Sequence, residues 1–528
     1  MSIAHPTHSL ASLLLACSAL VLLGSPAMAQ EDDAVPSSQV DTVYPGRPYS
    51  PYADRAFPTM VLFGDTHSHT SVSADAAGGG TKLGPRDAYR FARGEQVISN
   101  TGQPAKLQTP LDFYVVTDHT DGMGSIADIL SGTPNIMADP VGKEFHDKFN
   151  KGGQEAANAA FQLTAMFAQG KLPATLNYQP GNPAYAAVWD DLVKAADEFN
   201  DPGKFTTLFG FEWTSLVKGN NLHRVVIYRD DADKASAVLP YTTTRPQGSP
   251  DPRDLWKWLQ NYEDKTGGQV LAIPHNGNLS NGMMFPMVDD FDGGKPLDAD
   301  YAKARAKWEH LYEATQIKGD GESNALLSPE DEFAGFENWT AGNLDLSQAK
   351  TPEMLPHEYA RSGLKLGLEL DAKLGTNPFK FGMVGASDNH VGMTTSDNDN
   401  YFGKFTQYEP NPHRANHLSK ENKENGAKLY SWQYITSGLT AVWATANTRE
   451  AIFDAMQRRE VYATTGPRMR VRFFGGFDFT ADDAKGRNLA EVGYDKGVPM
   501  GGDISVAPAG KATSFLVYAM RDPVGANL

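Results

Sequence analysis

Seven short apolar runs recur along the first four-fifths of the chain, and this recurrence is the feature that most limits the possible folds. The runs occupy residues 59–65, 112–118, 205–212, 222–228, 269–275, 310–316 and 381–388. Short runs rich in β-branched and aromatic residues predict buried strands. Helical patterns lie between many of them, at 85–96, 185–199, 251–265 and 357–374. Strands that alternate with helices predict an α/β sheet or barrel with parallel strands, here expected over residues 59–465.

Two insertions and a C-terminal extension depart from this alternation. Residues near 123–180 are mostly helical and polar, and residues 396–428 have the composition of a long surface loop. A loop of that length is typical of a lid or a binding segment. Short strand patterns with turn residues predict a β-rich appendage over 466–528. The chain ends directly after one of these patterns, which is compatible with a truncated appendage.

The N-terminal segment predicts export. An apolar run from Leu10 to Leu23 is followed by Gly and Pro and then by "AMA" before Gln30. This order is typical of a signal peptide over 1–29 that is cleaved after Ala29, although no Lys or Arg precedes the run. A lipoprotein site at "LLAC" is the alternative, and it would leave the "AMA" site downstream. We expect a periplasmic or secreted protein with a linker over 30–58 and no stable membrane insertion after cleavage.

The cysteine count and the charge restrict the ligands and the partners. Cys17 is the single cysteine and lies in the segment expected to be removed, so the mature protein would have no disulfide and no thiolate metal site. Any metal ion must then be held by His, Asp and Glu. The formal net charge of −17 argues against nucleic acid or an anionic membrane surface as a partner. A negatively charged substrate would need local cations.

Histidine and acidic residues gather at the ends of the predicted strands. The set comprises His67, His69, Asp75, His119, Glu212, His223, His275, Asp388 and His390. The carboxyl ends of parallel strands form one face of an α/β barrel, so residues far apart in sequence can meet there. His223 is the least well placed, because it begins its apolar run. Nine nitrogen and oxygen ligands exceed the need of one tetrahedral ion, so we expect two or three divalent ions, namely Mn, Zn or Fe.

The order of these motifs resembles a known family. H-x-H, an acid six residues on, T-D-H, a strand-end Glu, an isolated His, P-H and S-D-x-H are similar to the polymerase and histidinol phosphatase (PHP) superfamily. The stretches "GDTHSHTSVSADA", "FGFEWTS", "IPHNGN", "YEATQIKGDGE", "GASDNHVG" and "VYATTGPR" further resemble a bacterial branch, domain of unknown function 3604. The resemblance implies a distorted (β/α)7 barrel, up to three metal ions and phosphoesterase activity. It also implies that the nine residues above are metal ligands and that Glu212 bridges two ions.

The ligand set predicts hydrolysis by a metal-bound hydroxide. Paired divalent ions about 3.5–4 Å apart lower the pKa of a bridging water and stabilise both the attacking and the leaving oxygen. Asp118 is a candidate for orienting a metal-bound imidazole, with a solvated strand-end acid as the alternative. Lys318, in a glycine-rich turn, is a candidate cation for a phosphorylated small-molecule substrate, with a plain surface lysine as the alternative. Arg224 is discounted, because consecutive strand residues point to opposite faces.

Two other classes of function compete with a phosphoesterase. An amidohydrolase-like barrel that cleaves amides or lactones also begins with H-x-H, but Asp75, His119 and the closing D-x-H pair fit that pattern poorly. A metal-binding module without catalysis is the second alternative. It predicts occupied metal sites and no turnover.

Overall fold

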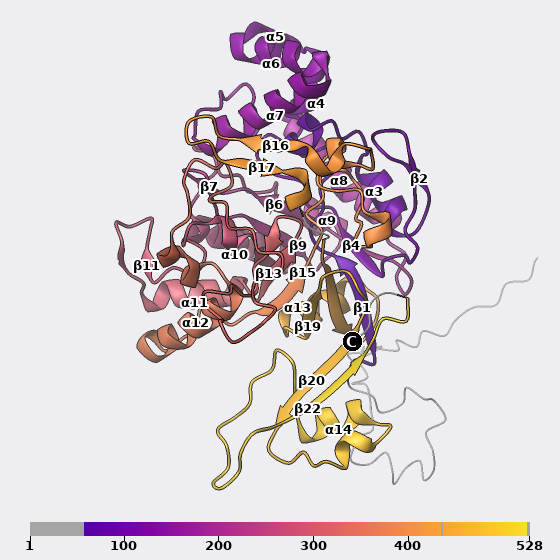
Figure 1. Cartoon of the computed structure of the whole chain (residues 1–528), viewed down its shortest axis with the longest axis vertical. Helices are drawn as coiled ribbons and strands as arrows, with labels where there is room; N and C mark the ends of the chain where they lie inside the picture. Colours follow the sequence, from indigo (N-terminus) through magenta and orange to yellow (C-terminus); the bar gives the residue numbers. More distant parts are fainter. Residues whose placement is uncertain (1–56, 435–436, 525–528) are drawn as a thin grey trace, which may run out of the picture. The chain divides into compact units, whose positions relative to one another are not determined.

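The computed structural model describes residues 57–434 and 437–524 (Figure 1). The predicted signal peptide and almost all of the predicted linker lie outside these residues. Among the described helices, none has both the length and the apolarity needed to cross a bilayer.

The central strands form three sheets, whose strand orders are β19-β18-β1-β4-β5, β10-β9-β6 and β14-β13-β15. Their bounds are β1 (Met60–Asp65), β4 (Phe113–Val115), β5 (Thr206–Leu208), β6 (Gly210–Trp213), β9 (Arg224–Tyr228), β10 (Val270–Pro274), β13 (Leu311–Gln316), β14 (Gly319–Asp320), β15 (Gly382–Gly385), β18 (Leu439–Ala444) and β19 (Val461–Thr464). Every predicted strand is therefore present, and the run 205–212 is divided between β5 and β6.

Single bridges join these sheets edge to edge. The bridges pair Ser68 with Asn389, His119 with Glu212, and His275 with Glu313. Pairing thus leads from β1 through β4, β6, β9, β10, β13 and β15 back to the residues after β1. The bridges are isolated, and no continuous ladder closes a barrel among the described residues. The structure shows a mixed α/β fold.

One strand of the second sheet runs against the predicted direction. β9 is antiparallel to both β6 and β10, and Arg224 pairs with Trp213 on one side and with Pro274 on the other. The connection from β6 to β9 holds only the small hairpin of β7 (Leu216–Val217) and β8 (Asn220–Asn221), which is too short for the crossover that parallel strands need. The prediction of parallel strands is therefore wrong for β9. Its reversal brings the amino end of β9 beside the carboxyl ends of its neighbours.

The core is divided between the two faces of these strands. Val225 and Ile227 belong to a cluster that strands of all three sheets share with helix α13 (Arg449–Gln457). Val226 and Tyr228 belong to the larger cluster that packs against the outer helices. The alternation follows from the two-residue period of a strand. Helices α3 (Pro85–Ala92), α8 (Pro183–Phe199), α10 (Pro252–Thr266) and α12 (Ala360–Leu374) coincide with the four predicted helical segments, and α9 (Ala232–Ser236) and α11 (Ala299–Trp308) are additional.

The first insertion is helical, as predicted, and the second contains a hairpin. The first holds α4 (Ser125–Ser131), α5 (Pro134–Ala138), α6 (Pro140–Lys151) and α7 (Gly153–Ala168). In the second, β16 (Leu418–Glu421) pairs with β17 (Lys428–Tyr430), which corrects the prediction of a plain surface loop (Figure 1). The turn is closed by hydrogen bonds from the Asn422 amide to Ala427 and from the Gly426 amide to Asn422.

The C-terminal region contains a small antiparallel sheet of β20 (Arg470–Gly476), β21 (Gly497–Pro499) and β22 (Ser514–Met520) with helix α14 (Leu489–Lys496) (Figure 1, yellow). The remaining elements are α2 (Ala74–Gly78), β2 (Val97–Ile98), β3 (Pro104–Ala105), β11 (Val288–Asp289) and β12 (Lys295–Pro296). Short 3-10 helices lie at Gly277–Leu279, Pro352–His357, Asn398–Asn400, Thr406–Tyr408, Arg414–Asn416, Ser431–Gln433 and Asp483–Lys485. The domain boundaries predicted from sequence stay predictions.

Candidate metal centre

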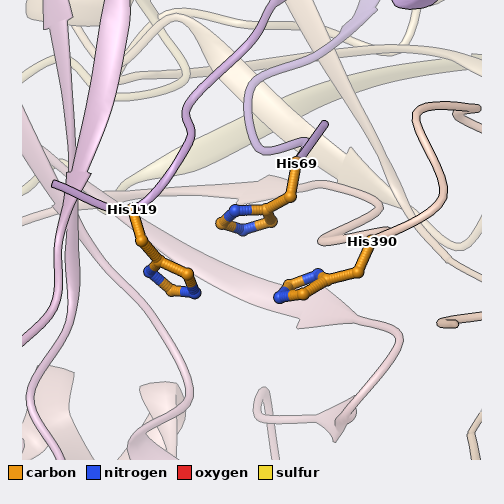
Figure 2. A group of neighbouring side chains, drawn as sticks. All are labelled: His69, His119 and His390. Atoms are coloured by element: carbon orange, nitrogen blue, oxygen red, sulfur yellow. The ribbon is translucent and has the colours of Figure 1, made fainter. Parts of the chain in front are cut away.

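Six predicted histidines converge at one edge of the strands. The Nε2 atoms of His67 and His69 are 3.0 Å apart. The rings of His69, His119 and His390 come from three separate segments and lie close together, with 4.5 Å between the centroids of His69 and His119 and 4.0 Å between those of His69 and His390 (Figure 2). The remaining two, His223 and His275, have ring centroids 5.6 Å apart. His223 reaches the cluster because β9 is reversed.

Glu212, on β6, lies at the middle of these rings and is buried. Its Oε2 atom is 2.8 Å from His119 Nδ1, 3.2 Å from His69 Nε2 and 3.4 Å from His67 Nε2. Its Oε1 atom is 2.6 Å from His223 Nδ1 and 2.7 Å from His275 Nε2. One carboxylate thus contacts five of the six imidazoles, which is the position that a carboxylate shared between ions would occupy.

Two aspartates complete the predicted set from opposite sides. Asp75, on α2, places Oδ2 2.8 Å from Nε2 of His390 and 3.4 Å from Nε2 of His119. Asp388, three residues after the end of β15, places Oδ1 3.3 Å from His69 Nε2. The structure therefore brings all nine predicted side chains into one cluster.

The donor atoms form four overlapping groups, and the atoms of each group lie within 4.8 Å of one another. The groups are His69–His119–His390, His67–His69–Glu212, His67–His275–Glu313 and His119–Glu212–His223. All of these residues are buried. Imidazole and carboxylate donors of this kind suit Zn, Mn and Fe.

Unsatisfied atoms at the centre test whether a cation would fit. Among the described residues, His223 Nε2 and His275 Nδ1 are buried without a hydrogen-bond partner, and the short contacts of Glu212 Oε2 and His275 Nε2 lack the geometry of a hydrogen bond. A buried polar group left unsatisfied costs about 1–3 kcal/mol. Divalent cations would occupy these lone pairs and separate the facing nitrogens of His67 and His69. The residues present therefore fit a metal centre.

The electrostatics of the cluster divide the six imidazoles. Burial alone would lower the pKa of His67 and His119, but nearby carboxylates, Glu313 and Glu212 foremost, raise it, whereas burial prevails and lowers the pKa of the other four rings. Burial lowers the pKa of His223 to about 3 and that of His390 to about 4, and burial also lowers the pKa of His275. Neutral imidazole is the form that binds metal. Burial alone would raise the pKa of Glu212, but the surrounding imidazoles, His119 foremost, hold that pKa well below its usual range. The central carboxylate is thus ionised.

The two predicted catalytic residues have different surroundings. Asp118 accepts hydrogen bonds from the Thr70 amide at 2.6 Å and from the Thr70 hydroxyl at 2.7 Å. Both of its oxygens therefore hold the loop that follows H-x-H, and the structure does not support the prediction that Asp118 orients an imidazole. Lys318 is 6% exposed and its ammonium group pairs with Asp388, so it is not a plain surface lysine. It therefore reaches the cluster, and its role as a substrate-binding cation stays a prediction.

Sequence reasoning missed several residues around the centre. Glu313, on β13, accepts from His67 Nδ1 at 3.0 Å, which is how a carboxylate orients an imidazole ligand. The sequence did contain an indication of Glu313. It lies two residues after Leu311 on the same strand face, and an acid on a face that otherwise packs in the core is unusual. Lys404 lies 2.7 Å from Asp388 Oδ1, and burial lowers the pKa of its ammonium group to about 7. Lys404 comes from the second insertion and had no local sequence signal.

A cavity of about 920 Å³ adjoins the centre. His119, His223 and His390 line it, as do Lys318, Lys404 and Lys420. The cluster is therefore reachable from a space that also presents cations.

The chain was compared with known protein families, curated proteins and solved structures. A family model described as "Protein of unknown function (DUF3604)" matches residues 56–528. No curated protein matches the chain. A solved structure from Bacteroides vulgatus ATCC 8482, described as a two-domain protein containing a predicted PHP-like metal-dependent phosphoesterase, is similar at 10% identity with a TM-score of 0.31. That match covers 88% of each chain.

Proposed function

The chain belongs to the DUF3604 family of proteins of unknown function, and from this premise and the geometry of its metal centre we propose that it is a metal-dependent hydrolase, specifically a phosphoesterase. The observation that carries the proposal is the buried cluster of six imidazoles around Glu212, three of which, His119, His223 and His390, line a cavity that lysines also line. We infer two or three ions of Mn, Zn or Fe, held by the nine predicted ligands.

The ions, when bound, would lower the pKa of water to supply a nucleophile at neutral pH and would neutralise charge on the reacting group. The protein's own residues do the remaining work. Glu313 holds the His67 ring by its Nδ1 atom, and Ser73 contacts His69 Nδ1 at 2.8 Å. These contacts leave the Nε2 atom of each ring directed at the centre. Lys318 and Lys404 place two ammonium groups beside Asp388, where they would bind the oxygens of an anionic ester.

The proposal also covers fold and location. Because the bridges link seven strands in a ring, we infer the distorted (β/α)7 barrel of the PHP superfamily, interrupted at three seams. We propose that the protein acts in the periplasm or outside the cell on a small phosphorylated molecule rather than on nucleic acid.

The test is elemental analysis of the purified protein together with a hydrolysis panel of phosphomonoesters, phosphodiesters, amides and lactones. We expect two or three metal equivalents per chain and turnover of a phosphate ester. Turnover of amides or lactones alone would support an amidohydrolase instead. Stoichiometric metal without hydrolysis of any compound would indicate a metal-binding module.

A further inference from the structure

Helix α7 forms part of the wall of the cavity. Most of the α7 residues that line the cavity are apolar, namely Ala157, Ala160, Phe161, Leu163, Ala165 and Phe167, and Asn158, Gln162 and Thr164 line it as well. Phe161 is only partly buried, so its ring is not fully used by the protein core. An apolar wall that shares a cavity with metal-ligating side chains suits a ligand with one charged end and one apolar end.

Hydrogen bonds hold the three segments around this cavity in place. The Gln169 side chain, just after α7, donates to Asp345 Oδ2 at 2.8 Å. Lys420, on β16, donates to the Leu344 carbonyl at 3.1 Å, and the Asn422 side chain donates to the Leu346 carbonyl at 3.0 Å. The helical insertion, the 343–347 loop and the β16–β17 hairpin are thus tied to one another. The cavity is largely preformed.

The apolar wall is also coupled to the metal centre through helix α2. This helix carries Asp75 and packs against α7. The approach is close: a Cβ atom added at Gly78 would lie 3.1 Å from the Cβ of Ala160. Asp75 and Phe161 therefore face the same space from two helices in contact.

The size of the cavity exceeds the need of a phosphate group. Pockets for drug-sized ligands span about 300–1,000 Å³, and 920 Å³ lies near the upper end of this range. Most of the space must therefore be available to the part of the substrate that is not the reacting ester.

We propose that the substrate is an anionic ester with a bulky apolar leaving group, and that Phe161 determines this specificity. The inference rests on the proposed phosphoesterase function and names its substrate class. The phosphorus–oxygen bond to the leaving group breaks and a bond to the water oxygen forms. One proton of the water passes to the released alcohol and the other leaves with the phosphate product or to solvent. Phe161 touches the leaving group and takes no part in proton transfer.

The experiment compares hexyl phosphate with ethyl phosphate on the metal-loaded full chain. The two leaving alcohols have nearly the same acidity, so a difference in kcat/KM reports contact with the additional methylenes. We expect a preference for hexyl phosphate on the order of 10²-fold. Phe161→Ala should reduce this preference about tenfold, whereas Phe161→Leu should retain most of it.

The matched control is Phe333→Ala, which removes the same ring from a position that is 72% exposed and does not line the cavity. It should leave the preference unchanged. Circular dichroism and metal content establish that each variant is folded and loaded. Equal kcat/KM for the two esters, or an unchanged preference in Phe161→Ala, would overturn the inference while the phosphoesterase function stands.

A binding readout separates the two proposals. If neither ester is hydrolysed, the phosphoesterase proposal fails, and isothermal calorimetry of both esters with the metal-loaded protein still tests the apolar wall. Tighter binding of hexyl phosphate that weakens in Phe161→Ala and not in Phe333→Ala would support an apolar ligand. Equal affinity for the two esters would refute it.

Discussion

His223, just before β9, and Arg224, its first residue, belong to two different buried charge clusters. His223 joins the metal centre, and Arg224 points away from it to Glu309, with 3.1 Å between Arg224 Nε and Glu309 Oε1. Arg305 Nε lies 2.8 Å from the other Glu309 oxygen, and the Trp256 indole donates to Oε1 at 3.0 Å. The triad of Arg224, Glu309 and Arg305 thus gives each charge a partner of opposite sign. Glu309 Oε2 accepts no hydrogen bond but is paired with Arg305, whereas His223 Nε2 and His275 Nδ1 in the metal centre are buried without a hydrogen-bond partner among the described residues.

The triad stabilises the fold, whereas the metal centre is arranged to bind a ligand. A buried ion pair that is complete within the protein is costly to break and does not bind an outside group. A buried cluster whose nitrogen and oxygen lone pairs are unsatisfied is unfavourable until a cation binds to it. Metal binding there should therefore add to the stability of the folded state. Substitutions in the two clusters should therefore have effects of different kinds.

The largest effect is expected from Glu212→Gln in the metal centre. The change removes the charge that five imidazoles share, so metal content should fall and kcat/KM on the best ester should drop by at least about 10³-fold. Elemental analysis and kinetics measure the two losses, with circular dichroism as a check on folding. Full metal content and full activity in this variant would refute our account of the centre.

The same substitution in the triad should act on stability instead. Glu309→Gln leaves two buried arginines without a carboxylate, which should lower the free energy of unfolding by about 3–5 kcal/mol. Urea denaturation of the metal-free protein measures it. Metal content per folded molecule should stay at the wild-type value. A loss of metal as large as that in Glu212→Gln would show that the clusters are not separate.

Glu313→Gln should have an intermediate effect, because our proposal gives Glu313 the role of holding the His67 ligand, although its carboxylate also lies in a donor group with His67 and His275. Loss of the charged acceptor for His67 Nδ1 should weaken metal affinity about 10- to 100-fold. Competition with a chelator of known affinity measures the change. An unaltered affinity would mean that the His67 ring is held in place by packing alone.

The smallest effect is expected from Arg229→Met, just beyond the far end of β9. Arg229 forms two hydrogen bonds with Asp454, at 2.7 and 3.1 Å, but its side chain is 26% exposed and that of Asp454 is 45% exposed. Solvent screens such a pair, so the free energy of unfolding should change by less than about 1 kcal/mol. A cost as large as that of Glu309→Gln would show that pairing matters more than burial.

Site residues in local motifs could be predicted from the sequence, and those brought to the site only by tertiary contacts could not. His67 and His69 occupy alternating positions after an apolar run, so their convergence could be read directly. The placement of His223 depended on the direction of β9, and the apolar run alone does not reveal direction. The short connection from β6 did indicate the direction of β9, because parallel strands need a longer crossover.

The two largest omissions have the same physical origin. Lys404 comes from a polar stretch between β15 and β18 and reaches Asp388 only in the folded chain. The β16–β17 hairpin has charged residues on both strands, so it lacks the alternation of apolar and polar residues that predicts a strand. Segments held mainly by side-chain hydrogen bonds to distant loops leave little periodic signal.

The seams between the three sheets pass through the centre, because two of the three bridges pair candidate ligands or their supports. Each seam has few hydrogen bonds: the Thr120 amide donates to the Glu212 carbonyl at 3.0 Å, and the Asp388 amide to the His67 carbonyl at 2.8 Å. Bound ions would link residues of adjacent sheets at these seams and so stabilise the contact between the sheets. Amide hydrogen exchange at Thr120 and Asp388 should then accelerate when metal is withdrawn, while exchange at Val226, inside β9, should continue to follow global unfolding.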